Sequence, residues 1–298
     1  MKIGFSIPNN QGIEDPNDLV MLATAAERSG FSSVWVHEHL FHTSYVEKRL
    51  GTRPYHDALT VLTAIACATT TVRLGTSVLV LPWHDPARLG KMIATLDHLS
   101  GGRVDMGIGV ATARDEFENL GVDFGTRGKR TDEILGALKA LWTQDRPHFS
   151  GEFYHYKGMI FSPRPKQTPH PPILIGGSSM AALRRVARFG DGWHTLRQTP
   201  RQFAEGRQKI NALMEEANRD PSTLDLSISV SMKFNGAKPE IPVEDRLSLT
   251  GTDDDILDTL RAFQAAGVDE IIVAVNSAEL PLNKEGMAHI MLRIWPRL

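Results

Sequence analysis

The segment Ile173-Leu174-Ile175-Gly176-Gly177-Ser178-Ser179, with the residues that continue it to 195, decides the fold. An apolar run over 172–176 predicts a buried strand, and glycines and serines end it. A stretch of helical period then leads to a second short run at 191–195. A strand, a helix and a second strand in this order are typical of parallel strands covered by helices.

The same alternation continues in both directions from this segment. We count eight strand-and-helix pairs, and most of the strands are rich in Val, Ile and Leu, as fully buried parallel strands should be. The sequence therefore predicts the α/β class and, within it, a (β/α)8 TIM barrel. A chain of 298 residues, 41% of them hydrophobic, fits one barrel domain over 1–298. The predicted strands cover residues 2–7, 33–36, 73–80, 103–108, 172–176, 191–195, 225–232 and 269–275.

Helix starts and one insertion add detail to the barrel. Asp15-Pro16 and Asp85-Pro86 each place a capping carboxylate before a proline at the first helical position, and Thr252-Asp253-Asp254-Asp255 resembles a capping box. Residues from about 109 to 171 are too many for a plain crossover. They contain a predicted helix over 130–143 and a predicted hairpin over 149–162, so we interpret them as an insertion after the fourth strand.

Composition argues against several kinds of partner. The formal net charge is -2 and Lys and Arg are spread along the chain, so neither nucleic acid nor an anionic membrane is expected to bind. The first residues are strand-like rather than a signal peptide, and no apolar run is long enough for a bilayer, which predicts the cytoplasm. The single cysteine, Cys67, cannot form an intramolecular disulfide, offers no metal cluster and is expected to be a buried small side chain. We therefore expect a small-molecule substrate.

Active sites of parallel barrels lie at the carboxyl ends of the strands. After the fifth strand, Gly176, Gly177, Ser178 and Ser179 precede a helix, so backbone amides at a helix N-terminus could hold a cofactor phosphate. A tight turn capped by Ser178 explains the same residues equally well. After the fourth strand, Gly107-Ile108-Gly109 indicates only a close approach to the backbone.

His37-Glu38-His39 follows the second strand. A histidine at a strand end can pass a proton to or from a substrate near neutral pH. Two other interpretations stay open. Paired histidines occur in metal sites, although no Cys, Lys or His after strands four, five or eight completes a ligand set. Ordinary hydrogen-bonded loop residues are the third possibility. Neither Ser178 nor Ser179 lies in a Gly-x-Ser-x-Gly elbow, so serine hydrolase chemistry has little support.

Several stretches together carry a family resemblance over nearly the whole chain. They include Ser33-Val34-Trp35-Val36-His37-Glu38-His39 and Arg73-Leu74-Gly75-Thr76-Ser77-Val78, followed in order by 95–103, 116–122, 127–133, 172–179 and 189–193. In this order they resemble the luciferase-like, or bacterial-luciferase-type, oxidoreductases, and most closely the short members that use the deazaflavin coenzyme F420.

The resemblance implies a redox cofactor whose tricyclic ring lies across the barrel mouth, against a non-prolyl cis peptide at Ser77-Val78. It implies hydride transfer between F420 and a small organic substrate, with His39 as the catalytic residue that handles the proton, and no metal ligand. The implied cofactor contacts are Glu38, Thr76, Ser77, Val78, Gly109, Val110, Gly176, Gly177, Ser178 and Ser179.

The chain departs from its relatives after the fourth strand, where it has Val110-Ala111-Thr112. The family's sugar-phosphate dehydrogenases have a glutamate at the position of Val110, so by this pattern an acid partner for His39 is missing. The alternative function is an FMN-dependent monooxygenase supplied by a separate flavin reductase, and a metal-dependent hydrolase is a third; the short chain favours F420. The resemblance also implies a homodimer. Substrate loops are expected at 41–54, 110–114 and 234–245.

Overall fold

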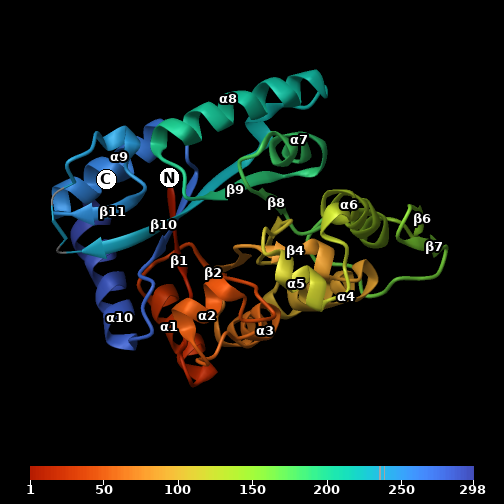
Figure 1. Ribbon diagram of the computed structural model, residues 1–298, viewed down its shortest axis with the longest axis horizontal. Coiled ribbons are helices and arrows are strands. Elements are labelled where there is room, and N and C mark those ends of the chain that lie inside the picture. Colours follow the sequence, from red (N-terminus) through yellow and green to blue (C-terminus); the bar gives the residue numbers. More distant parts are fainter. Residues whose placement is uncertain (235, 238) are drawn as a thin grey trace.

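The computed structural model describes residues 1–234, 236–237 and 239–298, in which eight parallel strands close into a barrel (Figure 1). The strand order is β10-β12-β1-β2-β3-β5-β8-β9, and β9 pairs with β10 to close the ring. The predicted (β/α)8 fold is confirmed, and each predicted strand overlaps one strand of the barrel. These strands are β1 (Lys2–Ser6), β2 (Ser33–Val36), β3 (Arg73–Thr76), β5 (Val104–Gly109), β8 (Ile173–Gly176), β9 (Gly192–Leu196), β10 (Asp225–Phe234) and β12 (Glu270–Ala274).

Two short strands extend the barrel wall. A cis peptide bond joins Ser77 to Val78, as the resemblance predicted, and separates β3 from β4 (Leu79–Val80). β4 pairs with the end of β5, so the chain stays in the barrel wall after the cis bond. β11 (Ser248–Gly251) pairs in parallel with the end of β10, where the sequence analysis assigned no strand. Residues 235 and 238, inside the third expected substrate loop, lie outside the described residues.

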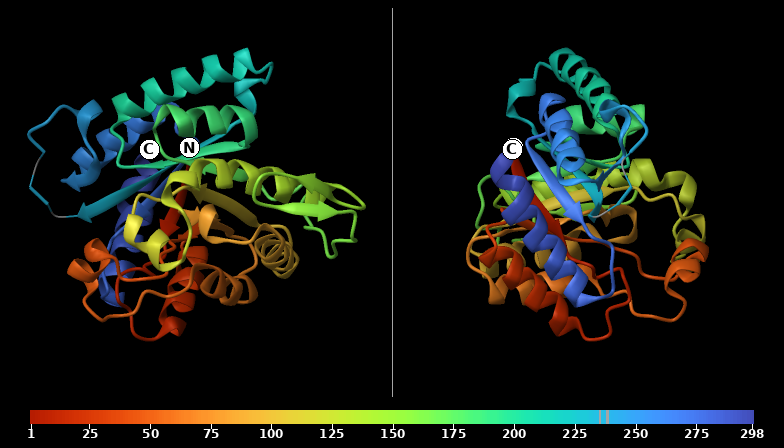
Figure 2. Two further views of the ribbon diagram at one scale, coloured as in Figure 1. Left: turned by 45° about the vertical axis from the view of Figure 1, so that its right-hand side comes forward. Right: turned by 90° about the vertical axis from the view of Figure 1, so that its left-hand side faces the viewer.

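Helices surround the barrel in both views of Figure 2. The predicted caps are present: the Asp15 side chain accepts from Asn17 N, the Asp85 side chain accepts from Arg88 N, and Thr252 forms a capping box. No helix in the described ranges is both long and apolar enough to cross a bilayer. The helices are α1 (Pro16–Arg28), α2 (Ser44–Leu50), α3 (Ala58–Ala68), α4 (Pro86–Ser100), α5 (Arg114–Asn119), α6 (Arg127–Thr143), α7 (Met180–Phe189), α8 (Pro200–Glu216), α9 (Asp253–Ala265) and α10 (Leu280–His289).

The long segment after β5 contains both a regular barrel helix and additions to it. α6 packs on α4 and buries Ile134, Leu138 and Trp142, so it serves as the helix of the fourth strand-and-helix unit. The predicted hairpin is present as β6 (His148–Ser150) and β7 (His155–Lys157), and it projects from the body of the molecule in Figure 1 and in the left view of Figure 2. The additions are therefore α5 and this hairpin.

The main apolar core lies between the barrel and its helices. Leu22 of α1, Ile65 of α3 and Ile93 of α4 are fully buried in it. α3 turns Leu62, Ile65 and Ala66 inward, and this orientation leaves Cys67 on its outer face. The expectation that Cys67 is buried is therefore wrong.

The barrel interior has its own small core. Trp35 clusters there with Leu174 and Ile272, and its ring stacks on His194 at 4.6 Å between ring centroids. Gly75 makes room for this ring, because a Cβ at position 75 would lie 2.3 Å from it. Trp35 therefore fills the barrel below the carboxyl ends of the strands.

The amino end of the barrel is closed by polar side chains. Arg73 Nε donates to Asp105 Oδ2 at 2.6 Å, and Glu270 Oε1 accepts from the Ser33 hydroxyl at 2.7 Å. Burial raises the pKa of Asp105 and of Glu270 above their usual values. In this fold, polar interactions at the amino end contribute to stability, and the chemistry lies at the opposite end.

Candidate active site

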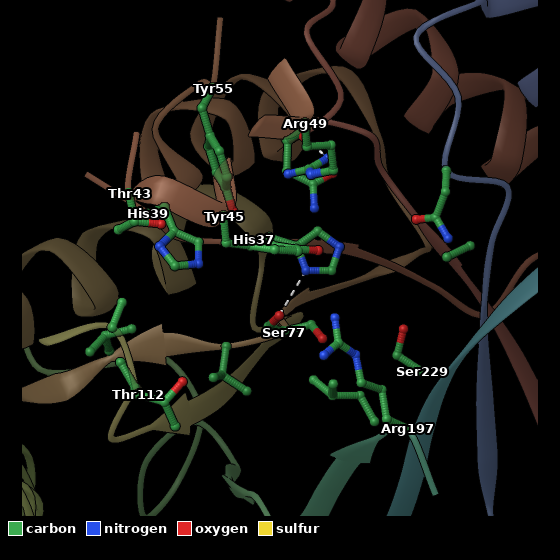
Figure 3. A pocket seen from close by; sticks show the side chains of 18 of the residues that line it. His37, His39, Thr43, Tyr45, Arg49, Tyr55, Ser77, Thr112, Arg197 and Ser229 are labelled. Atoms are coloured by element: carbon green, nitrogen blue, oxygen red, sulfur yellow. Dashed lines mark hydrogen bonds between the residues drawn. The ribbon is translucent and has the colours of Figure 1, made fainter. Parts of the chain in front are cut away.

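A cavity of about 1440 Å³ opens at the carboxyl ends of the strands (Figure 3). Typical small-molecule sites enclose roughly 300–1,000 Å³, so this cavity has room for a cofactor and a substrate together. Its walls come from the segments that follow β1, β2, β3, β5 and β9, and from the ends of β10 and β12. The lining includes Asn10, Gln11, His37, His39, Tyr45, Arg49, Tyr55, Ser77, Val78, Ala111, Thr112, Arg114, Leu196, Arg197, Ser229, Ser231, Ser248 and Asn276.

His39 lines this cavity and is paired with a buried carboxylate. Its Nδ1 lies 2.7 Å from Glu116 Oε2, while the other oxygen of Glu116 accepts from Leu40 N at 2.9 Å and Phe41 N at 3.2 Å. The Glu116 side chain is fully buried, whereas that of His39 is 28% exposed. Because an ionised carboxylate only accepts, the proton lies on Nδ1, and Nε2 is the ring nitrogen left for a substrate.

The expectation that His39 lacks an acid partner is therefore wrong. Val110 does stand where the sugar-phosphate dehydrogenases of the family carry a glutamate, but α5 brings a different carboxylate to the same ring. Glu116 lay within one of the stretches that carried the resemblance, and only the position of α5 revealed its role. A histidine oriented by a buried carboxylate is a common arrangement for proton transfer.

Two histidines hold Ser77 from two sides: His194 is buried, and His37 is partly exposed to the cavity. The carbonyl oxygen of Ser77 lies 2.8 Å from His37 Nδ1, and its hydroxyl lies 2.8 Å from His194 Nε2. Beyond them, His37 Nε2 is 2.8 Å from Ser6 Oγ, and His194 Nδ1 is 2.8 Å from Ser227 Oγ. A chain of hydrogen bonds thus crosses the barrel mouth through Ser77.

Both histidines of this chain are neutral at neutral pH. Burial lowers the pKa of His37 to about 4 and that of His194 to about 3. A carbonyl oxygen only accepts, so His37 donates from Nδ1 and its Nε2 accepts from the Ser6 hydroxyl. The network positions the Ser77 peptide without placing a charge beneath the cavity.

Both nitrogens of His37 are used in this way, so His37 offers no free ligand atom to a metal. Within residues 1–234, 236–237 and 239–298, no group of three or more His, Cys, Asp or Glu side chains is arranged to hold a metal ion.

Val78 lies in the cavity lining and rests on two glycines. A Cβ on Gly109 would lie 2.6 Å from Val78 Cγ2, and one on Gly176 would lie 3.2 Å from Val78 Cγ1. The predicted residues Gly109 and Gly176 therefore support the cavity wall rather than form it. Thr76 is also beneath the wall, where its hydroxyl donates to the Gly107 carbonyl at 2.7 Å.

Glu38 lies away from the cavity, although the resemblance implied a cofactor contact. Its buried carboxylate accepts from Val80 N at 2.6 Å and lies 2.9 Å from His84 Nε2. Burial opposes a charge on His84, but the hydrogen bond and the charge of Glu38 outweigh it and raise the pKa of His84. In this geometry Glu38 positions the segment after the cis bond, and its predicted cofactor contact has no support.

The loop of Gly176, Gly177, Ser178 and Ser179 and the neighbouring Val110 also lie outside the described cavity lining. Gly177 has a φ of 96° and its carbonyl accepts from Trp193 Nε1 at 2.7 Å. Ser179, rather than Ser178, caps α7 by accepting from Ala182 N at 3.2 Å. This cap leaves Ser178 free of the capping role, with its hydroxyl 3.5 Å from Gln198 Nε2. A phosphate site at this loop stays a prediction.

Three non-glycine residues of the cavity lining have left-handed backbone. Ala111, Arg197 and Asn276 have φ values of 52°, 55° and 56°, and all three line the cavity at the ends of β5, β9 and β12. Such φ values are uncommon outside glycine, and they cluster at functional sites where the surrounding structure enforces them. The backbone at the ends of these strands is thus shaped to place particular side chains.

Besides the buried Glu116, sequence reasoning missed several side chains of the cavity lining, among them Arg49, Tyr55 and Arg197. Arg49 and Tyr55 come from the expected substrate loop at 41–54 and its immediate continuation, and Arg197 follows the sixth barrel strand. Burial raises the pKa of the Tyr55 hydroxyl above its usual value, so this group is a neutral hydrogen-bonding side chain. Arg197 could have been found by extending the strand-end rule two residues beyond Thr195.

The fold and the cavity together define a (β/α)8 barrel enzyme with its site at the carboxyl ends of the strands. The family model for luciferase-like monooxygenases matches residues 1–235, and the chain belongs to this family. Members of the family are F420-dependent or flavin-dependent oxidoreductases and monooxygenases, so this protein is an enzyme of that kind.

Relatives in sequence use both kinds of cofactor. An uncharacterised protein of Mycobacterium tuberculosis is 33% identical over 215 residues, covering 67% of this chain and 72% of the relative. An FMNH2-dependent dimethylsulfone monooxygenase of Pseudomonas putida is 34% identical over 177 residues, or 58% of this chain and 47% of the relative. An F420-dependent glucose-6-phosphate dehydrogenase of Amycolatopsis mediterranei is 33% identical over 197 residues, which cover 65% of this chain and 56% of the relative.

Solved structures share the fold over nearly the full length. The monooxygenase RslO1 of Streptomyces bottropensis superposes with a TM-score of 0.85 at 23% identity, covering 100% of this chain and 99% of that one. An F420-dependent secondary alcohol dehydrogenase, in complex with an F420-acetone adduct, has a TM-score of 0.80 at 18% identity and coverages of 95% and 96%.

Proposed function

We propose that this protein transfers a hydride between coenzyme F420 and a small organic substrate, and that His39 carries the accompanying proton. The observation that carries the proposal is the hydrogen bond between His39 and the buried Glu116 on the wall of a cavity that is large enough for two molecules. Hydride transfer to or from a carbonyl carbon needs a proton at the oxygen, and a cavity-facing imidazole can supply or accept it.

In this proposal the ring system of the cofactor would rest against the cavity wall at Ser77 and Val78. Both residues line the cavity, and the supporting glycines Gly109 and Gly176 leave no side chain of their own against Val78. When bound, F420 would accept or donate the hydride at its C5. The chain of hydrogen bonds through His37 and His194 would keep the Ser77 side of the wall fixed during that transfer.

His39 would act through Nε2. Glu116 holds Nδ1–H, which orients the ring and stabilises the imidazolium when Nε2 takes up a proton. In the oxidation of an alcohol, Nε2 would remove the hydroxyl proton; in the reverse reaction it would return that proton to the oxygen. Thr43 and Tyr55 line the same side of the cavity and can direct a substrate oxygen toward it.

A second candidate is an FMN-dependent monooxygenase supplied by a separate flavin reductase. The 34% identity with the FMNH2-dependent enzyme of Pseudomonas putida favours it. In that case the same cavity would exclude water from the reduced flavin, and His39 would serve as a base toward the substrate.

Titration of the purified protein with oxidised F420 and with FMN, followed by fluorescence and absorbance, separates the two candidates. We expect stoichiometric F420 binding that is tighter than FMN binding; tight FMN binding with none for F420 would overturn the proposal. The metal content of the purified protein should also be measured, since stoichiometric zinc would favour a hydrolase.

The role of His39 is tested by His39→Ala. The variant should keep its F420 affinity and lose most turnover with any alcohol or ketone found in a substrate screen. Unchanged turnover would remove His39 from the mechanism, and lost binding would make it a cofactor contact.

A further inference from the structure

Two arginines enter the cavity from opposite walls. Arg49 belongs to α2, and Arg197 follows directly after β9. In Figure 3 Arg49 lies above the His37 ring and Arg197 below it, and each guanidinium group points toward the region between them, near Ser77. Both side chains line the cavity that also holds His39.

Neither guanidinium has an ion-pair partner among the described residues. Arg49 Nη1 donates to the Asn10 carbonyl at 2.6 Å, and its guanidinium lies 5.8 Å from the centre of the Tyr45 ring. Its Nε is buried and has no hydrogen-bond partner in the described part of the chain. These neutral contacts orient Arg49 but leave its charge uncompensated.

Arg197 is placed by unusual backbone. Its φ of 55° lies in the left-handed region, which costs free energy for a residue other than glycine. Ser229 lies beside it on the same wall (Figure 3). A structural role alone would be met better by glycine, so the side chain itself accounts for the presence of arginine at this position.

The charges in the cavity favour an anion between the two arginines. Guanidinium groups stay ionised, and two like charges that line one cavity repel each other. Arg49 is partly buried, with a buried Nε, whereas Arg197 is exposed. Glu116, the buried carboxylate of α5, already accepts from His39 and two backbone amides. Asp115 and Glu118 line the α5 side, and neither forms an ion pair with Arg49 or Arg197.

We propose that Arg49 and Arg197 form a two-arginine anion site that binds a carboxylate, phosphate or sulfonate group of the substrate. One anion that accepts from both guanidinium groups compensates both charges and forms charge-assisted hydrogen bonds with them. The inference deepens the proposed function and rests on it: the substrate of the hydride transfer is a small organic anion.

The anion could also belong to the cofactor, because F420 and FMN carry phosphate groups. Arg197 is next to Gln198, whose amide lies 3.5 Å from the Ser178 hydroxyl in the predicted phosphate loop. Arg49 contacts the segment after β1 instead. An anion that needs both arginines therefore lies between the two sides, and cofactor affinity measured in each variant distinguishes the sources.

The experiment compares sulfate binding and cofactor binding in four proteins: wild type, Arg49→Gln, Arg197→Gly and the control Lys48→Gln. Lys48 is an exposed residue of α2, and its substitution removes the same charge outside the cavity lining. Glycine adopts the left-handed φ of residue 197 without strain, so Arg197→Gly is expected to keep the fold, and circular dichroism checks this. Sulfate affinity is measured by titration calorimetry on the cofactor-free protein. A thermal-shift assay is unsuitable, because sulfate also stabilises proteins nonspecifically.

We expect sulfate to bind wild type and Lys48→Gln equally, and to bind Arg49→Gln and Arg197→Gly on the order of 10- to 100-fold more weakly. F420 and FMN affinities should stay within about threefold in all four proteins, a change of well under 1.4 kcal/mol. Sulfate binding that is absent from wild type, or unchanged in either arginine variant, would overturn the anion site.

A tenfold or greater loss of cofactor affinity in either arginine variant would assign the anion to the cofactor and overturn the substrate assignment. If wild type bound neither cofactor while its sulfate binding still depended on both arginines, the proposed function would fail and the anion site would stand.

Discussion

Replacing Glu116 by glutamine tests how the structure orients His39. The Glu116 carboxylate accepts from three donors at once: His39 Nδ1 on one oxygen, and Leu40 N and Phe41 N on the other. Glutamine has one acceptor oxygen and one NH2 group, so it cannot satisfy all three. If its oxygen keeps the two backbone amides, its NH2 faces Nδ1, and the proton of His39 must move to Nε2.

The expected size of the effect follows from these contacts. A hydrogen bond to a charged group contributes about 1.5–3 kcal/mol, so wild-type His39 should favour the Nδ1–H tautomer by roughly tenfold or more. In Glu116→Gln the Nε2–H form should dominate, and Nε2 can then no longer accept a proton. Because positioned acid–base groups contribute about 10²- to 10⁴-fold, turnover should fall by that factor while F420 affinity is retained.

The tautomer can be measured directly from the ¹⁵N shifts of labelled histidine at about pH 9, where free imidazoles are neutral. This measurement needs no substrate. Glu118→Gln, which changes another cavity-lining carboxylate of α5, is the matched control and should leave the His39 tautomer unchanged. A His39 ring that stays in the Nδ1–H form in Glu116→Gln would refute this account of its orientation.

Three further outcomes are expected. His37 and His194 protonate in the unfolded chain near pH 6.5, but in the folded protein their pKa values are about 4 and about 3, so their stabilising effect is complete above pH 6.5 and is lost as the pH falls. At about pH 5.5, urea unfolding should therefore show a free energy of unfolding that is lower by roughly 1.4 kcal/mol for each ring than at high pH. The raised pKa values of Asp105 and Glu270 partly offset this loss. A free energy of unfolding that rises on acidification would contradict the prediction. Gly75→Ala should lower the free energy of unfolding by about 1–3 kcal/mol, because its Cβ would lie 2.3 Å from the Trp35 ring, and an unchanged urea midpoint would argue against this packing. Cys67 should react with a thiol reagent in the native protein, one equivalent per chain, and a requirement for denaturant would place it in a contact absent from the single chain.

Much of the fold was predictable because its signals are local. Apolar runs such as 173–175, helix caps such as Asp85 and the turn after each strand depend on residues close together in sequence. Parallel strands that are buried on both faces then permit few arrangements other than a barrel or an open α/β sheet. The strand β11 was missed because its sequence, Ser248-Leu249-Thr250-Gly251, shows no apolar run.

The candidate site was predictable only where it depends on strand ends. The rule that chemistry follows the carboxyl ends of barrel strands selected the segment 37–39, and the family resemblance singled out His39 and Ser77, which both line the cavity. The rule gives position along the barrel axis but not the direction in which each side chain points. Glu38 and His39 are neighbours in sequence, yet one turns to Val80 and His84 while the other faces the cavity.

By itself, the sequence determined the barrel, the end of the barrel that holds the site, and a histidine at that end. Only the tertiary structure decided what this histidine can do, because Glu116 lies 77 positions away and reaches it through the placement of α5. The presence of Arg49 and Arg197 in the lining of one cavity has the same origin. Local sequence patterns indicate which residues share one face of a helix or strand. Contacts between the ends of different strands form only when the barrel closes and brings the carboxyl ends of all its strands together.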